Sequence, residues 1–366
     1  MICYMFPGQG SQTKGMGEGL FDEFPEITKM ADDILGYSIK KLCLENENLQ
    51  LNNTQYTQPA IYVVNTLTYL KKLKQTKKKP DYVAGHSLGE YNALQVAGAF
   101  SFEAGLTLVK CRGELMAQAG EGAMAAILKM SKAQIRQCLD ENGLSSIDIA
   151  NYNGPAQIVI SGLPADINRA KIFIENAGSV FIPLNTSGAF HSRYMEPIKA
   201  QFESFLEQFE FAELNIPVIS NIDAQPYKNE SIKTYLASQI THSVMWEQSM
   251  LYLLELGIDE FEEIGNGQVL SKLIASIKLQ YSSTKKYSIK QTAQQSENIV
   301  DMPKNQIDNW NNHYPIGTPV KAKGYKKELQ TRSNAMFILN NKAVIYLLGY
   351  KGYFPLNEIS VIPSGK

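Results

Sequence analysis

Hydrophobic and polar positions alternate in two different ways along the first 120 residues. Residues 2–6 (ICYMF) and 81–85 (DYVAG) are short apolar runs, typical of buried strands. Residues 58–74 and 102–120 instead repeat their apolar side chains with the period of a helix. Strands that alternate with helices of this length predict a mostly parallel sheet covered by helices on both faces. We therefore expect an α/β fold for this part of the chain.

The pattern changes between residues 122 and 190. Here the predicted elements follow in the order strand, helix, strand, strand, helix, strand, at 123–130, 131–142, 147–153, 157–162, 165–178 and 179–185. This is the order of the ferredoxin-like split βαβ unit. We therefore expect one domain over residues 1–280, in which a large α/β subdomain (1–121 and 191–280) carries a ferredoxin-like insert (122–190).

The chain beyond residue 280 has a different composition. Residues 281–311 are rich in Gln, Ser and Lys and lack a sustained apolar period, which predicts a linker. After it, four short apolar runs bounded by Gly, Asn and Pro predict strands, and residues 312–366 are expected to form a small β-rich module rather than a disordered tail. The expected core of this module consists of Tyr314, Phe337, Ile345, Tyr346, Tyr350, Tyr353 and Phe354.

Composition and charge exclude several classes of protein. Of the 366 residues, 44% are hydrophobic and 19% are charged, which excludes wholesale disorder. The formal net charge of -1 gives no basic field for nucleic acid, although the residues from Tyr281 onward carry twelve Lys and Arg against five Asp and Glu, a net +7, which leaves -8 on the rest. The four cysteines form no CxxC pair, and there is no membrane span or signal peptide, so we expect a cytoplasmic protein without a metal site.

The sharpest chemical signal is GHSLG at residues 85–89. It has the G-x-S-x-G pattern of a nucleophile elbow and lies between a predicted strand and a predicted helix, which is the context such an elbow requires. Ser87 would be presented above the sheet, and the backbone N–H of Leu88 at the start of the helix would point at a developing oxyanion. The pattern therefore predicts Ser87 as a nucleophile.

A serine nucleophile needs a base, and the chain has four histidines. His86 is adjacent to Ser87, so its side chain should diverge, and His313 lies in the tail. His191 and His242 remain. His191 is favoured because it follows the last predicted strand of the insert, in a loop of small residues (NTSGAFHSRYMEP) where two subdomains meet. The alternative is that His191 is a surface or packing residue.

Arg112 lies on the apolar stripe of its predicted helix, together with Leu108, Leu115 and Ala119. A buried guanidinium must find a partner, because an uncompensated buried charge is costly. The explanations that stay open are an internal ion pair or a snorkelling stem on one side, and a clamp for an anionic substrate on the other. Gly113 beside it is unfavourable inside a helix by about 1 kcal/mol, which suggests a close approach of another group.

Five motifs resemble, in this order, those of the malonyl-CoA:acyl carrier protein transacylases, and most of all the discrete, trans-acting acyltransferases of polyketide synthases. They are FPGQGSQ (6–12), GHSLGEY (85–91), the RG at 112–113, SGAFHSRYM (187–195) and EIGNGQVL (263–270). The resemblance covers about residues 1–280. It implies an α/β-hydrolase-like large subdomain with a ferredoxin-like insert, in agreement with the order of the predicted strands.

The resemblance also implies a role for each matching residue. Ser87 is the serine that is acylated, His191 its base, and Arg112 the group that binds the free carboxylate of malonyl. The family has no acidic third member of the triad; instead a main-chain carbonyl, here that of Gln239, orients the histidine.

Three further residues match family positions around the acyl group. The backbone N–H of Gln9 completes the oxyanion hole with that of Leu88. Gln58 is a polar pocket residue, and Phe190 resembles the residue that crowds out an α-methyl group. Gly188 departs from the family, because malonyl-selective relatives often have a histidine at this position.

The activity implied is transfer of malonyl from malonyl-CoA, through a malonyl-serine, to the phosphopantetheine thiol of an acyl carrier protein, without a cofactor. A polyketide synthase is the expected partner, and neither nucleic acid nor a membrane is. Alternatives are a hydrolase that clears stalled acyl groups from carrier proteins, a malonyltransferase of fatty-acid synthesis, and a non-catalytic protein whose basic tail docks an acidic carrier protein. The retained Arg112 favours transfer over hydrolysis.

Overall fold

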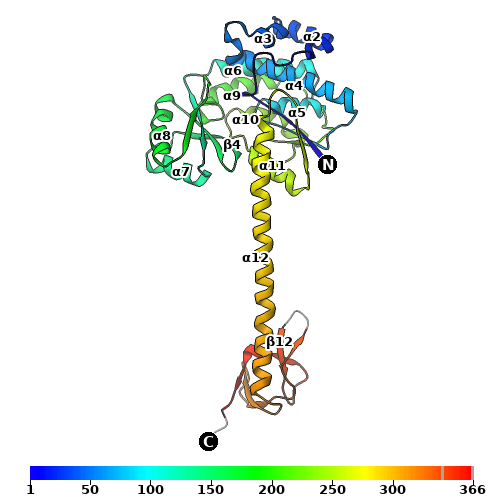
Figure 1. Ribbon diagram of the computed structural model, residues 1–366, viewed down its shortest axis with the longest axis vertical. Helices are drawn as coiled ribbons and strands as arrows, with labels where there is room; N and C mark the ends of the chain where they lie inside the picture. Colours follow the sequence, from blue (N-terminus) through cyan, green and yellow to red (C-terminus); the bar gives the residue numbers. More distant parts are fainter. Residues whose placement is uncertain (339–341, 364–366) are drawn as a thin grey trace. The chain divides into compact units, whose positions relative to one another are not determined.

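The computed structural model describes residues 1–338 and 342–363, with side chains for all of these except 284–305, 337 and 338. The chain divides into two compact units, Met1–Tyr281 and Ser282–Lys366. Figure 1 shows the first unit with its helices around a central sheet. No helix in the described part of the chain combines the length and the apolar character that crossing a membrane would need.

The central sheet of the first unit is parallel throughout, with the strand order β7-β2-β1-β8. Its strands are β1 (Ile2–Phe6), β2 (Tyr82–Gly85), β7 (Val218–Ile219) and β8 (Glu260–Glu263). Successive side chains of β1 enter different cores. Tyr4 and Phe6 pack with α4 (Thr54–Thr76), α5 (Gly89–Val96) and α6 (Phe102–Ala117). Cys3 and Met5 pack with α11 (Trp246–Glu255) and the start of α12 (Val269–His313). Both faces of the sheet are therefore covered, as the apolar runs predict.

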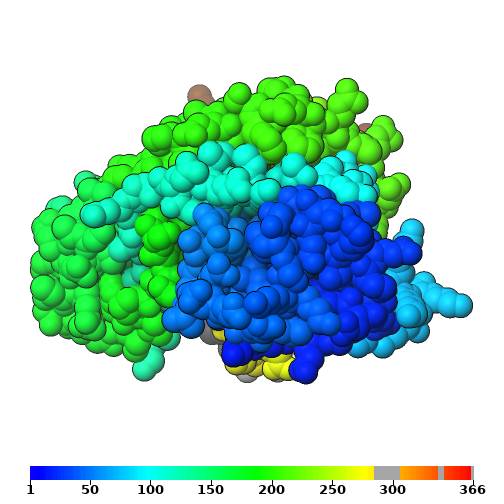
Figure 2. Space-filling view, turned by 90° about the horizontal axis from the view of Figure 1, so that it is seen from above, coloured from blue at the N-terminus to red at the C-terminus, as the bar shows by residue number. Residues whose placement is uncertain are grey.

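The helices around this sheet agree with the predicted periodicity. Those that carry site residues are α4 (Thr54–Thr76), α5 (Gly89–Val96), α6 (Phe102–Ala117) and α10 (Ile232–Gln239). The others are α1 (Leu20–Glu23), α2 (Pro25–Leu35), α3 (Ile39–Glu45), α9 (Glu196–Leu206) and α11 (Trp246–Glu255), with 3₁₀ turns at Glu47–Asn52, Arg193–Met195 and Asn229–Ser231. Figure 2 shows the face of the unit formed by α2 and α3, in blue, with the insert in green at one side.

The insert has a sheet and a core of its own. Its elements are β3 (Ala123–Leu128), α7 (Lys132–Glu141), β4 (Asp148–Gly154), β5 (Gln157–Gly162), α8 (Pro164–Asn176) and β6 (Val180–Pro183). The strands pair antiparallel in the order β4-β5-β3-β6. One helix begins with a full capping box, in which Ser131 and Gln134 bond reciprocally. The insert is tied to the large subdomain by backbone bonds between Ala150, Tyr152 and Val244.

The segment predicted as a linker is helical in the structure. It lies within α12 (Val269–His313), whose first turns pack in the first unit and whose last turns belong to the second. No glycine occurs between residues 267 and 317, and Gln, Lys, Ala and Glu are good helix formers, which favours a helix without an apolar stripe; Pro303, which lacks a backbone N–H, is the one residue here that opposes it. Ile307 and Trp310, which the sequence places in the linker, lie in the core of the C-terminal module.

In the described residues of the C-terminal module, six short strands form two antiparallel sheets, β10-β9-β14 and β11-β12-β13, where four strands are predicted. They are β9 (Pro319–Ala322), β10 (Leu329–Gln330), β11 (Met336–Ile338), β12 (Lys342–Tyr346), β13 (Tyr353–Pro355) and β14 (Ile359–Val361), with a 3₁₀ turn at Leu356–Glu358. Two differences account for this: β10 lies outside the predicted runs, after a turn at Gly324, and the last predicted run, residues 352–362, is divided into β13 and β14 by the 3₁₀ turn.

The predicted core of this module is partly correct. Ile345 is fully buried, and Tyr314, Tyr350 and Phe354 are half-buried against the same cluster. Tyr346 is also half-buried. Tyr353 is 48% exposed, so its assignment to the core is wrong: neighbouring side chains of a strand face opposite sides, and Phe354 takes the inward position. The side chain of Phe337 lies outside the described residues.

Candidate active site

A pocket of about 90 Å³ lies where the large subdomain meets the insert. Its walls come from the loops after β1, β2 and β6, from α4 and α6, and from β3 and β4. Every site residue that the sequence predicts lines it except Gln239. The lining residues are Gln9, Gln58, His86, Ser87, Leu88, Arg112, Met116, Met124, Asn151, Leu184, Thr186, Phe190 and His191.

Ser87 lies at a sharp turn between β2 and α5. Its φ of 50° is in the left-handed region, which is strained for a residue with a side chain. The turn can close only because both flanking residues are glycines. A Cβ on Gly85 would lie 2.0 Å from the carbonyl carbon of Gly89, and one on Gly89 would lie 2.0 Å from the carbonyl oxygen of Phe6. This is the local geometry of a nucleophile elbow.

Asn221 holds this turn in place, and sequence reasoning missed it. Its Oδ1 accepts a hydrogen bond from the backbone N–H of Ser87 at 2.7 Å, and its Nδ2 donates to the carbonyl oxygen of Gly85 at 2.6 Å. Asn221 follows β7 and is 134 residues from Ser87 in the chain. Nothing in its local sequence marks it, because its function depends on which strand lies beside β2.

Among the four histidines, His191 has its imidazole against Ser87. Its Nε2 lies 2.8 Å from Ser87 Oγ, and its Nδ1 donates to the carbonyl oxygens of Gln239 at 2.8 Å and His242 at 3.1 Å. Since carbonyl oxygens can only accept, Nδ1 carries the proton and Nε2 offers its lone pair to the serine hydroxyl. Burial, together with the charge of Arg112, lowers the pKa of His191 to about 3, so the imidazole is neutral at pH 7.

The other histidines have different surroundings. His86 points away from Ser87, as expected: its Nε2 bonds Asn153 Oδ1 at 2.7 Å and its ring packs against Trp246. The imidazole of His242 is exposed and bonds the carbonyl oxygen of Ser238, so only its own carbonyl group reaches the site. His313 is exposed at the end of α12.

Arg112 is 1% exposed and has no carboxylate partner among the described residues. Its Nη1 donates to Gln58 Oε1 at 2.6 Å, and its Nη2 donates to Gln239 Oε1 at 2.9 Å and to Ser87 Oγ at 3.3 Å. The guanidinium also lies over the ring of Tyr91, 5.5 Å from its centroid. No carboxylate of the described residues lies within ion-pair distance, so the direct internal ion pair weighed from the sequence is not formed: amides orient the guanidinium, and the carboxyl of Glu90 acts on it only from beyond hydrogen-bond distance.

Gly113 explains how α6 comes close enough to α4. A Cβ on this residue would lie 3.2 Å from the carbonyl oxygen of Thr54 and 3.3 Å from the Cα of Gln55. The close approach that the glycine suggests is thus the first turn of α4, the helix that also carries Gln58. Because Gly113 has no side chain, α6 with Arg112 and α4 with Gln58 can pack closely against each other.

The backbone of the loop after β1 lies against the elbow. A Cβ on Gly8 would lie 2.3 Å from the carbonyl oxygen of His86 and 3.4 Å from the amide nitrogen of Leu88. Among the backbone hydrogen bonds of the described residues, none is donated by the N–H of Gln9 or of Leu88. Two free backbone donors beside a nucleophile can stabilise an oxyanion.

Gln239, the remaining predicted residue, takes part through its side chain as well as its carbonyl group. Its Oε1 accepts from Arg112, and its Nε2 donates to the carbonyl oxygen of Ser87 at 2.9 Å and to Glu90 Oε2. Sequence reasoning missed Glu90, which is fully buried. Burial raises the pKa of Glu90 to about 8, against the opposing effects of its hydrogen bonds and the charge of Arg112.

The apolar wall of the pocket includes Phe190, Met116, Met124 and Leu184. A Cβ on Gly188 would lie only 2.7 Å from the ring of Phe190. The glycine that departs from the family pattern therefore leaves space for this ring. A larger residue at position 188 would displace Phe190 from its present place.

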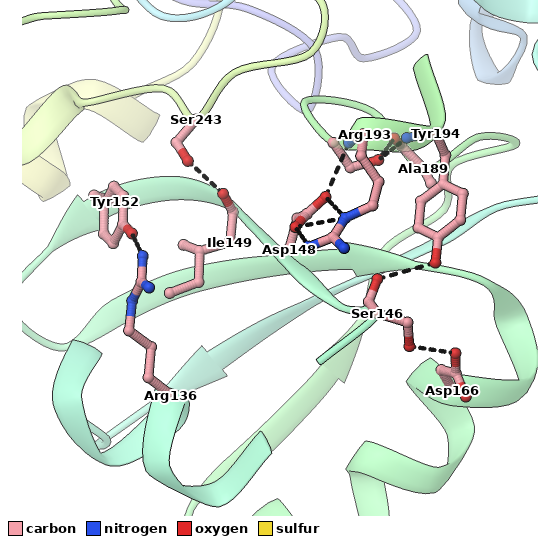
Figure 3. Close-up of polar contacts among 11 residues, drawn as sticks. Arg136, Ser146, Asp148, Ile149, Tyr152, Asp166, Ala189, Arg193, Tyr194 and Ser243 are labelled. Atoms are coloured by element: carbon pink, nitrogen blue, oxygen red, sulfur yellow. Dashed lines mark hydrogen bonds and ion pairs between the residues drawn. The ribbon is translucent and has the colours of Figure 1, made fainter. Parts of the chain in front are cut away.

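The loop that carries His191 is clamped to the insert next to the site. Figure 3 shows Arg193 reaching Asp148 on β4, and Tyr194 donating to the carbonyl oxygen of Ser146 at 3.0 Å. Arg193 forms a double contact, with Nη2 2.5 Å from Oδ1 and Nε 2.9 Å from Oδ2, and its backbone N–H adds a third bond. Burial acts to raise the pKa of Asp148, but the bonds from Arg193 outweigh it and hold the pKa below its usual value.

Comparison with known proteins gives a consistent result. Residues 3–309 match the acyl transferase domain family. A polyketide biosynthesis malonyl CoA-acyl carrier protein transacylase of Bacillus velezensis is 58% identical over 280 residues, which are 76% of this chain and 97% of that protein, so about a quarter of this chain has no counterpart there.

Solved structures agree with this match. A malonyl CoA-acyl carrier protein transacylase from Burkholderia pseudomallei superposes with a TM-score of 0.75 at 50% identity, over 76% of this chain and 98% of that one. A malonyl-transacylase in complex with its type II polyketide synthase acyl-carrier protein superposes with a TM-score of 0.72 at 33% identity, over 75% and 92%.

Proposed function

The chain belongs to the acyl transferase domain family, and from this membership we propose that it transfers malonyl from malonyl-CoA to the phosphopantetheine thiol of an acyl carrier protein in polyketide biosynthesis. One observation carries the choice of malonyl: Arg112 is buried beside Ser87 Oγ with amide partners, and no carboxylate of the described residues lies within ion-pair distance of it. A substrate that brings a free carboxylate supplies the missing countercharge. Acetyl-CoA brings none.

The first half of the reaction loads the enzyme. Ser87 Oγ attacks the thioester carbonyl while its proton passes to His191 Nε2, and the oxyanion lies between the N–H groups of Gln9 and Leu88. When the tetrahedral intermediate collapses, the C–S bond breaks and the CoA thiolate takes the proton from His191. The product is an ester between malonyl and Ser87.

The second half repeats these steps in reverse. His191 takes the proton of the carrier protein's thiol, the sulfur attacks the malonyl-serine ester, and Ser87 regains its proton from His191 as it leaves. The main-chain carbonyl of Gln239 holds the imidazole in the reactive tautomer throughout. No step calls for a metal or redox cofactor. A neutral His191 at pH 7 supports its role as the base.

Selectivity follows from two contacts with opposite character. Arg112, oriented by Gln58 and Gln239, binds the malonyl carboxylate. Phe190 fills the space that an α-methyl group would need, so methylmalonyl is disfavoured. Together they select an acyl group that is charged and unbranched.

The chain is also divided into subdomains and an added module. We assign residues 1–121 and 191–280 to an α/β-hydrolase-like subdomain and residues 122–190 to a ferredoxin-like insert, supported by the strand orders of the two sheets. An added β-rich module comprises residues 312–366 together with the last turns of α12, which supply Ile307 and Trp310 to its core, and the preceding part of α12 connects it to the first unit. We place the enzyme in the cytoplasm, which suits its four free cysteines.

Intact-protein mass spectrometry tests the proposal. Brief incubation with malonyl-CoA should add one malonyl group to the wild-type chain and none to Ser87→Ala. Adding a carrier protein with its phosphopantetheine arm should move that group to the carrier. Steady release of CoA and malonate without an adduct or a charged carrier would contradict transfer and favour the hydrolase.

A further inference from the structure

Glu90 is a buried carboxyl group for which the transfer reaction has no direct use. It lies in the first turn of α5, is fully buried, and does not line the pocket. Its Oε1 accepts the backbone N–H of Asn221 at 2.7 Å, and its Oε2 accepts from Gln239 Nε2. Glu90 therefore contacts the two residues that hold the elbow and Arg112.

We propose that Glu90 is a positioning residue that fixes the amide orientation of Gln239 and, through it, the place of Arg112 beside Ser87. This inference rests on the proposed malonyl transfer. Glu90 touches no substrate in that reaction. Its effect on selectivity passes through Gln239.

The hydrogen-bond pattern around Gln239 determines which way its amide faces. The NH₂ group meets two acceptors, Glu90 and the carbonyl oxygen of Ser87, while the Oε1 meets a donor, Arg112 Nη2. Reversing the amide would place NH₂ against the guanidinium and oxygen against two oxygens. The carboxylate form of Glu90, which has no proton to donate, is one of the two acceptors that exclude this reversed state.

Replacing Glu90 by glutamine keeps the shape and changes one acceptor into a donor. If the new NH₂ faces Asn221, two N–H groups oppose each other at the elbow. If it faces Gln239, the Gln239 amide must reverse and lose its bond to Arg112. Neither arrangement of the two amides satisfies every donor and acceptor. The substitution therefore tests orientation without creating a cavity.

We expect Glu90→Gln to lower the preference for malonyl over acetyl about tenfold, because a charge-assisted hydrogen bond at Arg112 is misplaced. The preference is the ratio of kcat/KM values for acylation by malonyl-CoA and acetyl-CoA, measured at a pH above the pKa of Glu90. Most of the change should be in KM for malonyl-CoA. Glu90→Asp keeps the charge but shortens the side chain, so it should also lower the preference, and it replaces Glu90→Gln if that variant does not fold.

Glu263→Gln is the matched control. The carboxyl of Glu263 also accepts backbone N–H groups in the first unit, those of Leu270 and Ser271, but lies outside the pocket. The Glu263→Gln variant should be less stable than the wild type but keep its preference for malonyl-CoA over acetyl-CoA. An unchanged or increased malonyl preference in folded Glu90→Gln or Glu90→Asp overturns the inference. A wild-type protein that malonyl-CoA does not acylate overturns the proposed function instead.

Discussion

Two arginines, Arg112 and Arg193, lie in neighbouring regions of the molecule and have opposite surroundings. At the junction with the insert, Arg193 is more than half exposed and meets Asp148 in a double contact. In the pocket, Arg112 is buried, and its hydrogen-bond and ring partners in the described part of the chain are amide oxygens, a hydroxyl and an aromatic ring. The arginine with less access to water is the one that, among the described residues, has no carboxylate within ion-pair distance.

This difference separates a structural charge from a functional one. The charge of Arg193 is paired within the chain, so its contribution is to stability and to the position of the His191 loop. The charge of Arg112 is oriented but not neutralised, a state that is costly unless a ligand completes it. The missing carboxylate in the pocket matches the free carboxylate of the proposed substrate.

Arg112→Ala should have the largest effect. Acylation of Ser87 by malonyl-CoA should fall about 100-fold in kcat/KM, since hydrogen bonds to a charged group are lost with the charge. Acylation by acetyl-CoA should change much less, as measured by intact mass after timed quenching. Arg193→Ala is the control and should keep the wild-type preference. A similar loss of preference in both variants would contradict the comparison.

The second-largest effect should be on the pH dependence of acylation. With the pKa of His191 at about 3, the wild-type rate should hold as the pH falls below 6.5, where an ordinary histidine takes up its proton and stops acting as a base. Part of this lowering comes from the charge of Arg112, so Arg112→Ala should move the acid limb to higher pH, measured with acetyl-CoA. Arg193→Ala should leave the limb in place. An acid limb near 6.5 in the wild type would show that His191 is not held neutral by its surroundings.

The C-terminal tail, from Tyr281 onward, carries a third group of positive charges, which can be removed without changing any residue of the pocket. Removing residues after Tyr281 should raise KM for an acidic carrier protein by roughly two- to tenfold, because long-range attraction mainly affects encounter. Acylation by malonyl-CoA should stay at the wild-type rate, since every pocket residue lies in Met1–Tyr281. An unchanged KM for the carrier would rule out electrostatic docking by the tail.

Asp148→Asn should have the smallest effect. Asparagine can still accept the backbone N–H of Arg193 but loses the charge, and a partly exposed pair contributes about 0.5–1 kcal/mol to the free energy of unfolding. Because the folded-state pKa of Asp148 is lowered, its stabilising effect is present above the unfolded value of 3.8 and disappears as the pH falls through the folded value. Thermal unfolding at neutral and acid pH would check this. A large loss at both would mean that the contact acts through packing.

Much of the site could be predicted because its signals are local. The glycines around Ser87 are needed by a turn five residues long, and the inward position of Arg112 follows from the period of a single helix. The residues alone favoured His191 over His242 without excluding the latter, since the distance from His191 to Ser87 depends on how the insert packs against the large subdomain. The nature of Arg112's partners was also open, because Gln58 and Gln239 come from two other helices.

The sequence by itself determined the alternation of strands and helices, the elbow, and the presence of an arginine on a buried face, since each depends on residues within one turn or one helix. Only the tertiary structure decided that Asn221 holds the elbow and that Glu90 meets Gln239, which lie 134 and 149 residues from their partners. Such contacts are set by which strands and helices become neighbours. No periodicity along the chain records them.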